Sequence, residues 1–231
     1  MWTTGIWNYI YPPRCPVCDG ISERGICDAC RPQLVYIRED YCMKCGKPLM
    51  DGQEEYCGDC GKRRHYFEQG RALFSYQGQV RPSLYRLKYA NRREYAAVYG
   101  REMAKHLGGW IRRMGITIIV PVPLHPSRQR MRGFNQAELL ADELGRCMGL
   151  PVDTQLLRRV RRTAPQKTLT GRQRKENLAG AFRTEDRIRQ GERILLVDDI
   201  YTTGSTADAA AFCLLRGGRC RVYVLSAAIG G

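Results

Sequence analysis

The sequence has no long apolar run. No uninterrupted apolar stretch in its 231 residues approaches the ~20 residues that a membrane-spanning helix needs, so we expect no stable membrane insertion. The aromatic start, MWTTGIWNYIYPPRC, lacks the basic segment and the small-residue cleavage site of a secretory signal, which indicates a cytoplasmic protein. No stretch has the form GxxxxGKS or GxxxxGKT either, and this absence argues against a P-loop NTPase.

Acidic residues are the minority of the charged residues. Lys and Arg number 38 against 23 Asp and Glu, and the sequence pI is about 9.6. A surplus of positive charge favours an anionic partner, and both phosphate esters and nucleic acids qualify. Net charge alone does not separate these two classes of ligand.

The cysteines are unevenly distributed. Eight of the eleven precede residue 61, where they form four Cys-x-x-Cys pairs. A two-residue spacer lets both thiolates of a turn reach one tetrahedral ion, and two such turns complete a closed four-sulfur zinc shell. We therefore predict two structural zinc ions. The expected ligands are Cys15, Cys18, Cys27, Cys30, Cys42, Cys45, Cys57 and Cys60.

Two alternatives to zinc are less favourable. A disulfide framework needs an oxidising compartment, and an iron–sulfur cluster suits the regular paired spacing less well than two tetrahedral sites do. The spacing leaves open which pairs share an ion: consecutive sharing, which we favour, gives two stacked ribbons, and alternate sharing gives a cross-brace. Because zinc supports a segment with too few apolar residues for a core of its own, we expect a double zinc ribbon over residues 1–67.

From about residue 67 the composition changes to apolar strands that alternate with amphipathic helices. We expect strands at 71–76, 117–125, 193–201 and 221–229, and helices at 94–110, 134–149 and 205–218. Strand, helix, strand order predicts right-handed crossovers and a mostly parallel sheet. Ligands of such sheets bind beyond the carboxyl ends of the strands.

The stretch RILLVDDIYTTGST, residues 193–206, carries a dense group of functional side chains. Asp198 and Asp199 follow the apolar ILLV, and a turn rich in hydroxyls with one glycine leads into the next helix. Such a turn suits a monophosphate at the positive helix end. The neighbouring carboxylates suit the hydroxyls of a sugar or a hard cation that bridges further phosphates. The combination predicts a phosphorylated ribose with an additional anionic group, and a bare structural turn is the alternative.

The same stretch resembles the phosphoribosyl pyrophosphate (PRPP) signature of type I phosphoribosyltransferases. The likeness extends to LYRLKYANRREYA at 84–96, PVPLHPSRQRMRGFNQAELLA at 121–141 and APQKTLTGRQRKENLAGAF at 164–182. Together with the cysteine pairs, the chain is similar over essentially its whole length to the ComF family of competence proteins. The resemblance implies an α/β, type I phosphoribosyltransferase fold over residues 68–231, behind the zinc ribbon.

The resemblance also implies roles for individual residues. Asp198 and Asp199 would be the catalytic positions and would contact the ribose hydroxyls, directly or through magnesium. The implied PRPP-binding residues are Lys88, Pro121, Val122, Pro123, Arg128, Arg130, Arg132, Thr202, Thr203, Gly204, Ser205 and Thr206. Of these, the turn at 202–206 would hold the 5-phosphate, and the loop with its three arginines would face the pyrophosphate, since guanidiniums suit phosphate oxygens. The segment 168–177 could close over the site and keep water out.

Two functions stay open. The family resemblance implies a PRPP-binding protein that acts in DNA uptake during natural transformation, with a helicase or other competence proteins as partners. The alternative is an active, magnesium-dependent phosphoribosyltransferase whose acceptor is unknown. Residues 158–175 contain eight basic residues and no acid, so this segment, with Arg159, Arg161 and Arg162, would attract single-stranded DNA in a salt-dependent way. Part of its charge could instead serve the small ligand.

Overall fold

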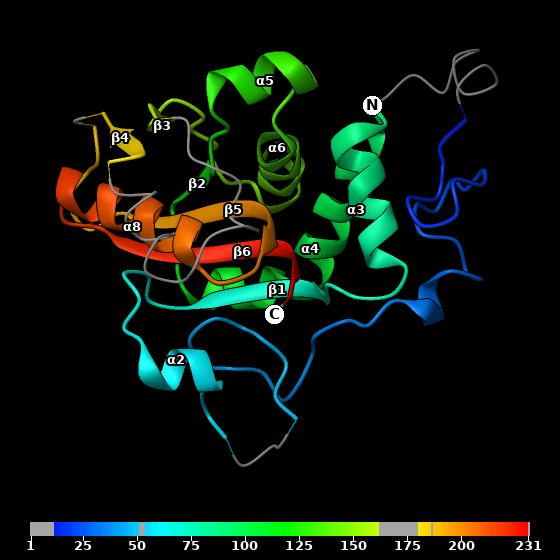
Figure 1. Cartoon of the computed structure of the whole chain (residues 1–231), viewed down its shortest axis with the longest axis horizontal. Helices are drawn as coiled ribbons and strands as arrows, with labels where there is room; N and C mark the ends of the chain where they lie inside the picture. Colours follow the sequence, from blue (N-terminus) through cyan, green and yellow to red (C-terminus); the bar gives the residue numbers. More distant parts are fainter. Residues whose placement is uncertain (1–11, 51–53, 162–179, 186, 231) are drawn as a thin grey trace.

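The computed structural model describes residues 12–50, 54–161, 180–185 and 187–230. Its centre is a four-stranded sheet in the order β1-β6-β5-β2, in which all neighbouring strands are parallel (Figure 1). These strands are β1 (Gly70–Ser75), β2 (Ile118–Pro121), β5 (Arg193–Tyr201) and β6 (Arg221–Ile229). The predicted α/β class with a mostly parallel sheet is confirmed.

The central strand β5 is buried on both faces. Leu195 and Val197 pack into the core beneath one set of helices, and Ile194 and Leu196 pack into the core on the opposite face. All four side chains have no exposed surface. This two-sided burial explains why the strand is a continuous apolar run rather than an alternation of apolar and polar residues.

Helices cover both faces of the sheet. Those at the predicted positions are α4 (Glu94–Arg113), α6 (Gln136–Met148) and α8 (Ser205–Gly217). Helices α4 and α6 pack against each other and share one core, and α8 covers the opposite face, in front of the sheet in Figure 1. Asn135 begins α6 by accepting the backbone N–H of Ala137 at 3.1 Å, and Gly149 ends it at φ 67°. Among the described residues, no helix is long and apolar enough to cross a membrane.

Several short elements had no clear signal in the sequence. They are η1 (Arg31–Gln33), α2 (Gly58–Lys62), α3 (Val80–Tyr89), α5 (Pro126–Arg132) and the antiparallel pair of β3 (Leu157–Arg159) with β4 (Phe182–Thr184). Most span fewer than eight residues, too few to display a hydrophobic period. Helices α3 and α5 matter most here, because both border the carboxyl ends of β2 and β5.

Strand β5 is longer than its neighbour β2. The pairing of these two strands ends at Pro121 and Val197, followed by a last hydrogen bond from the Val122 N–H to the Val197 carbonyl at 2.8 Å. On its other side β5 stays paired with β6 as far as Tyr201. From Asp198 onward, no described strand pairs with β5 on its β2 side, and we call this part of the strand its open edge.

The two ribbons contribute to different cores. Cys15, Ile26 and Leu34 of the first ribbon belong to the core beneath α3, α4 and α6, whereas Cys45 and Phe67 belong to the core beneath α8. In Figure 1 the first ribbon lies beside α3 and the second, with α2, lies beside β1. A domain boundary near residue 67 stays a prediction, because both ribbons are part of the cores of the α/β unit.

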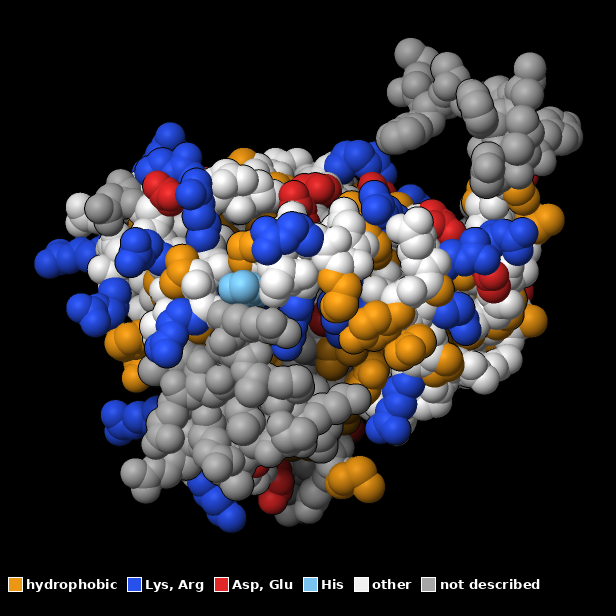
Figure 2. Space-filling model, turned by 45° about the horizontal axis from the view of Figure 1, so that its top comes forward, with side chains coloured by type: hydrophobic (Ala, Val, Ile, Leu, Met, Phe, Trp, Pro, Cys, Tyr) orange, Lys and Arg blue, Asp and Glu red, His pale blue; other side chains and the backbone are white. Residues whose placement is uncertain are grey.

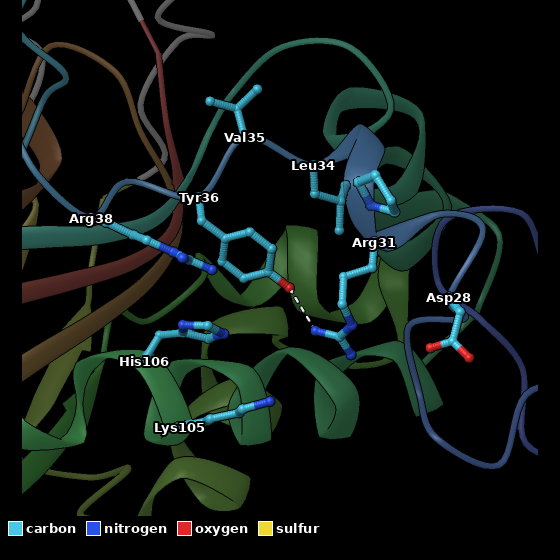
Figure 3. Close-up of a pocket in the computed structure, with 9 residues that line it drawn as sticks. Asp28, Arg31, Leu34, Val35, Tyr36, Arg38, Lys105 and His106 are labelled. Carbon is cyan, nitrogen blue, oxygen red and sulfur yellow. Dashed lines mark hydrogen bonds between the residues drawn. The ribbon is translucent and has the colours of Figure 1, made fainter.

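A buried carboxylate fastens the first ribbon to α4. Arg31 donates to both oxygens of Glu102, at 3.1 and 3.3 Å, and the Tyr36 hydroxyl donates to Oε2 at 2.7 Å. Arg31 also donates to the Tyr36 hydroxyl, as Figure 3 shows, and His106 Nε2 lies 3.3 Å from Oε2. Burial opposes ionisation of Glu102, but the hydrogen bonds from Arg31 and Tyr36 outweigh it and lower the pKa of this carboxyl.

Replacing this carboxylate is expected to destabilise the protein in a pH-dependent way. Glu102→Gln should lower the free energy of unfolding by about 1–3 kcal/mol at pH 7, because it leaves buried donors poorly paired. The pKa of Glu102 in the folded protein lies below the ordinary value of 4.5. The stability that the ionised carboxylate contributes is therefore fully present above pH 4.5 and is lost as the pH falls through the lowered pKa. Denaturant titrations at pH 7 and at acid pH measure the difference between wild type and variant. Glu23→Gln, an exposed position on the same ribbon, is the control, and a difference that does not shrink in acid would contradict the account.

Candidate functional site

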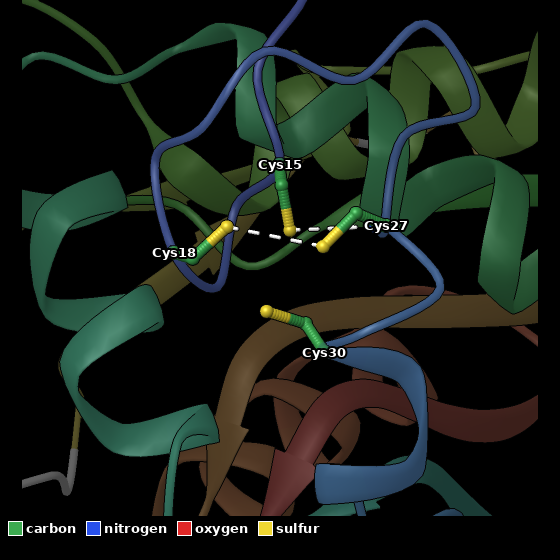
Figure 4. Close-up of side chains that lie close together, drawn as sticks. All are labelled: Cys15, Cys18, Cys27 and Cys30. Atoms are coloured by element: carbon green, nitrogen blue, oxygen red, sulfur yellow. Dashed lines mark hydrogen bonds between the residues drawn. The ribbon is translucent and has the colours of Figure 1, made fainter.

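The eight paired cysteines form two clusters. Consecutive pairs come together, Cys15, Cys18, Cys27 and Cys30 in one group and Cys42, Cys45, Cys57 and Cys60 in the other, with the Sγ atoms of each group all within 4.8 Å of one another. Figure 4 shows the four side chains of the first group directed at one point. The Sγ atoms of Cys18 and Cys27 are 3.9 Å apart and those of Cys45 and Cys57 are 3.7 Å apart. Tetrahedral zinc–sulfur bonds of ~2.3 Å place sulfurs ~3.8 Å apart, so both groups fit a structural zinc ion.

Each cluster contains one sulfur that ionises readily. Burial opposes ionisation of Cys15, but backbone N–H groups, led by that of Cys27, lower its pKa to about 7. A hydrogen bond from Cys60 lowers the pKa of Cys45 to about 6. Burial raises the pKa of Cys30. The thiolate is the form that binds metal, so the surroundings of Cys15 and Cys45 favour the zinc-binding state.

The predicted acid pair lies on the open end of β5. The Asp199 backbone N–H donates to Asp198 Oδ1 at 2.8 Å, and burial together with the neighbouring Asp199 raises the pKa of Asp198 to about 7. Lys88 of α3 approaches from the side, with its Nζ 2.8 Å from Asp199 Oδ2. Burial opposes the charge of Lys88, but the attraction of Asp199 outweighs it and raises the lysine pKa. The structure thus brings Lys88 to the acid pair.

The hydroxyl-rich turn follows immediately. Strand β5 ends at Tyr201 and α8 begins at Ser205, with Gly204 between them at φ 74°. The hydroxyls of Thr203 and Ser205 are 3.0 Å apart. A Cβ atom at Gly204 would overlap the Tyr201 hydroxyl, so this position needs glycine for its space as well as for its backbone angle. The predicted phosphate-binding residues 202–206 therefore do form one turn at the start of a helix.

The predicted pyrophosphate loop is fastened to α6. Pro121 and Val122 are buried and Pro123 is half-buried. Asn135 Nδ2 donates to the Val122 carbonyl at 3.1 Å, while its Oδ1 caps α6. The RGFNQ segment thus holds this loop beside the end of β5.

The predicted arginines have different surroundings. Arg132 donates to the Tyr89 hydroxyl at 2.9 Å and to Gln136 Oε1 at 3.1 Å, which joins α5 to α3. Arg128 is half-buried and Arg130 is exposed. Arg132 is therefore engaged with α3 and α6, and the pyrophosphate-binding role of the three arginines stays a prediction.

Arg159 belongs to the basic segment for which the sequence left two ligands open, single-stranded DNA and the small anionic ligand. Burial, and then the charge of Arg128, lower the pKa of Arg159, whereas the charge of Asp198 raises it, so Arg159 is within electrostatic range of both groups. Its guanidinium also lies 5.4 Å from the centre of the Phe182 ring on β4. No local pattern indicates this position, because β3 reaches the acid pair only through the tertiary fold. Arg162 and the segment 168–177 lie outside the described residues.

A cleft lies between the first ribbon and α4, and the sequence had not indicated it. Its volume is about 590 Å³, and its charged or titratable lining residues are Asp28, Arg31, Tyr36, Arg38, Lys105 and His106 (Figure 3). Arg38 and Lys105 are exposed, and Arg31 is engaged with Glu102. Burial lowers the pKa of His106. The cleft is therefore a second, mainly cationic feature besides the end of β5.

The turn is expected to tolerate no side chain at position 204. Gly204→Ala should lower the free energy of unfolding clearly more than Gly149→Ala, which has a similar φ of 67° but no atom within 4 Å of the added Cβ. The left-handed backbone costs both variants about 1 kcal/mol, and only position 204 adds the overlap with the buried Tyr201. Denaturant titration of the two variants measures the difference in their free energies of unfolding. Equal losses of stability would mean that Tyr201 moves aside for the added Cβ, and would contradict the prediction.

Comparisons with known proteins agree with these features. Residues 6–61 match the double zinc ribbon domain family. The chain is 36% identical over 207 residues to the DNA utilization protein YhgH of Salmonella typhi, which covers 88% of this chain and 90% of that protein. It is 31% identical to competence protein F of Haemophilus influenzae, over 84% of this chain and 86% of that protein. It is 30% identical to competence protein ComFC of Bacillus subtilis, over 85% of this chain and 80% of that protein.

Solved structures show partial likenesses. An adenine phosphoribosyltransferase matches with a TM-score of 0.39 at 16% identity, over 59% of this chain and 72% of that chain. The glutamine PRPP amidotransferase of Bacillus subtilis matches with a TM-score of 0.38 at 17% identity, over 62% of this chain and 30% of that chain. The parallel sheet, the acid pair on β5 and the turn into α8 are those expected of a type I phosphoribosyltransferase fold. With a double zinc ribbon over residues 6–61 and with relatives 30–36% identical over most of its length, the chain belongs to the ComF family of competence and DNA utilization proteins.

Proposed function

We propose that this protein binds PRPP together with magnesium at the end of β5. Asp198 and Asp199 hold the ribose hydroxyls, directly or through the metal, and the turn at 202–206 holds the 5-phosphate. The observation that supports this assignment is the adjacency of two carboxylates on the open edge of β5 and a hydroxyl-rich turn into α8. Backbone N–H groups and the dipole at a helix N-terminus favour a phosphate at that position.

The diphosphate end of the ligand meets cationic side chains. Arg159 of β3 is within electrostatic range of Asp198 and of Arg128 on α5, and Lys88 Nζ lies 2.8 Å from Asp199 Oδ2. Guanidinium groups bind phosphate oxygens through two donors at once. The loop at 121–123, which Asn135 holds in place through the Val122 carbonyl, lies beside the end of β5. Magnesium, when bound, supplies positive charge against the diphosphate oxygens. Two carboxylates alone would repel such a ligand, so these cations are needed for binding.

The wider role that we propose is DNA uptake in natural transformation, in the cytoplasm. It rests on the names of the relatives, which are competence and DNA utilization proteins. A helicase or another competence protein as partner rests on the family alone. The alternative is an active phosphoribosyltransferase with an unidentified acceptor, in which Asp198 and Asp199 hold the ribose while pyrophosphate leaves.

Calorimetric titration of the zinc-loaded protein with PRPP and magnesium tests the binding. Wild type should bind, and the double variant Asp198→Asn, Asp199→Asn should bind at least about tenfold more weakly, because it loses charge-assisted contacts. Glu54→Gln, Glu55→Gln removes a neighbouring pair of exposed acids and is the matched control. Failure of wild type to bind, or equal affinity of both double variants, would contradict the proposal. If wild type does bind PRPP, an assay of acceptor-dependent pyrophosphate release distinguishes a transferase from a protein that only binds PRPP.

Single-stranded DNA is the second ligand that we propose, and the cationic cleft is the observation that favours it. Arg38 of the inter-ribbon chain and Lys105 of α4 line the same cleft, are exposed, and have no acidic partner within salt-bridge distance among the described residues. Net charge does not locate this surface, since Figure 2 shows Lys and Arg side chains spread over the visible face rather than gathered in one patch. Arg159, in contrast, lies with the acid pair and is less suited to contact a DNA strand.

Removing the two cleft charges is expected to weaken DNA binding and its salt dependence. For Arg38→Gln, Lys105→Gln, the slope of log affinity against log salt should become shallower by about 1.4, since each lost phosphate contact removes ~0.7. Arg189→Gln, Arg219→Gln changes the charge equally at exposed positions elsewhere. Fluorescence anisotropy with a labelled oligonucleotide at several salt concentrations measures both slopes. An equal change in both double variants would mean that only net charge matters.

A further inference from the structure

A histidine bridges the second cysteine cluster and the helix that follows the proposed phosphate turn. His65 Nε2 lies 3.4 Å from the Cys60 sulfur, and His65 Nδ1 lies 2.9 Å from Asp208 Oδ2. The Tyr66 backbone N–H donates to the other oxygen, Asp208 Oδ1, at 3.1 Å. The His65 side chain is only 2% exposed, so the bridge is shielded from water. Both oxygens of Asp208 are therefore engaged by residues that follow the second ribbon.

Asp208 belongs to the first turn of α8. Its backbone N–H donates to the Gly204 carbonyl at 2.8 Å, which closes the first helical turn after the glycine. A movement of the Asp208 side chain is thus transmitted to the turn at 202–206. The carboxylate also lies one turn from the proposed 5-phosphate, and its contacts with His65 and Tyr66 orient it toward the ribbon.

The other end of the turn also contacts the second ribbon. Tyr201, the last residue of β5, is 7% exposed and packs edge-on against Phe67, with ring centres 6.3 Å apart. Its hydroxyl lies against Gly204. Burial, and then the nearby Cys45 and Cys60, raise the pKa of Tyr201, which indicates that the ring lies beside the second cluster. The turn is consequently held by this ribbon on both sides, through Tyr201 before it and Asp208 after it.

We propose that His65 is a positioning residue that couples metal binding at the second cysteine cluster to ligand binding at the turn 202–206. The inference rests on the proposed function, because it assumes that the turn binds the 5-phosphate of PRPP. A residue that contacts a metal ligand orients that ligand, and its loss commonly weakens metal binding or activity. Coupling between two sites is reciprocal, so PRPP should in turn alter the metal environment at the second cluster.

Calorimetry of variants tests one direction of this coupling. His65→Gln and, from the other side of the bridge, Asp208→Asn should each weaken PRPP binding about tenfold while the protein still contains two zinc ions per chain. Glu68→Gln, at an exposed position three residues after His65, should bind as wild type does. Wild-type affinity in the zinc-loaded His65→Gln and Asp208→Asn proteins, or an equal loss in Glu68→Gln, would overturn the inference. If one variant fails to fold, the other decides, since they change opposite ends of the bridge.

Cadmium-113 NMR tests the other direction with a readout that does not depend on activity. The cadmium-loaded protein should give two resonances, and the one that His65→Gln moves belongs to the second cluster. PRPP, and ribose 5-phosphate as a probe of the 5-phosphate alone, should shift that resonance in wild type and leave it unchanged in Asp208→Asn. If calorimetry detects PRPP binding but the resonance does not move, the coupling is wrong and the proposed function stands. If PRPP does not bind to wild type at all, both are wrong.

Discussion

The length of β5 relative to β2 is the constraint on which the site depends. Leu195 and Val197 pack on one face of the sheet while Ile194 and Leu196 pack on the other, so a shift of the strand by one residue would exchange the two buried faces. In the observed register β2 ends beside Val197, and the next two residues of β5, both acidic, lie on an edge that has no β2 partner. Pairing with β6 as far as Tyr201 keeps this edge rigid, and rigid elements position functional groups better than loops do.

Electrostatic balance at this edge comes from elements that are distant in sequence. Lys88 of α3 pairs with Asp199, and Arg159 of β3 is within electrostatic range of Asp198. Two neighbouring carboxylates in a partly buried position need such cations, since burial makes each uncompensated charge costly. The same cations can turn to an anionic ligand when a metal ion or sugar hydroxyls engage the carboxylates. The arrangement is therefore suited to a ligand that carries hydroxyls at its centre and phosphates at both ends.

The parts that sequence predicts well are those with local chemistry or a regular period. Two-residue spacers determine that Cys15 pairs with Cys18, and buried strands such as β5 are visible as continuous apolar runs. The cluster partners, the parallel order of the strands and helices α4, α6 and α8 follow the predictions closely, but β2 ends at Pro121, four residues before the predicted end of its strand. In contrast, the His65 contact with Asp208 joins residues that are 143 positions apart, and nothing near either one indicates the other. Arg159 is read from sequence as one of several basic residues, and only the fold turns it toward Asp198.

A crystal structure of the zinc-loaded protein with PRPP and magnesium tests the central claim most directly. The account predicts that the 5-phosphate lies within hydrogen-bonding distance of the backbone at Ser205 and Thr206, with the ribose hydroxyls or the metal ion on Asp198 and Asp199. Density for PRPP at the cleft beside Arg38 and Lys105 alone, with the end of β5 unchanged, would contradict it.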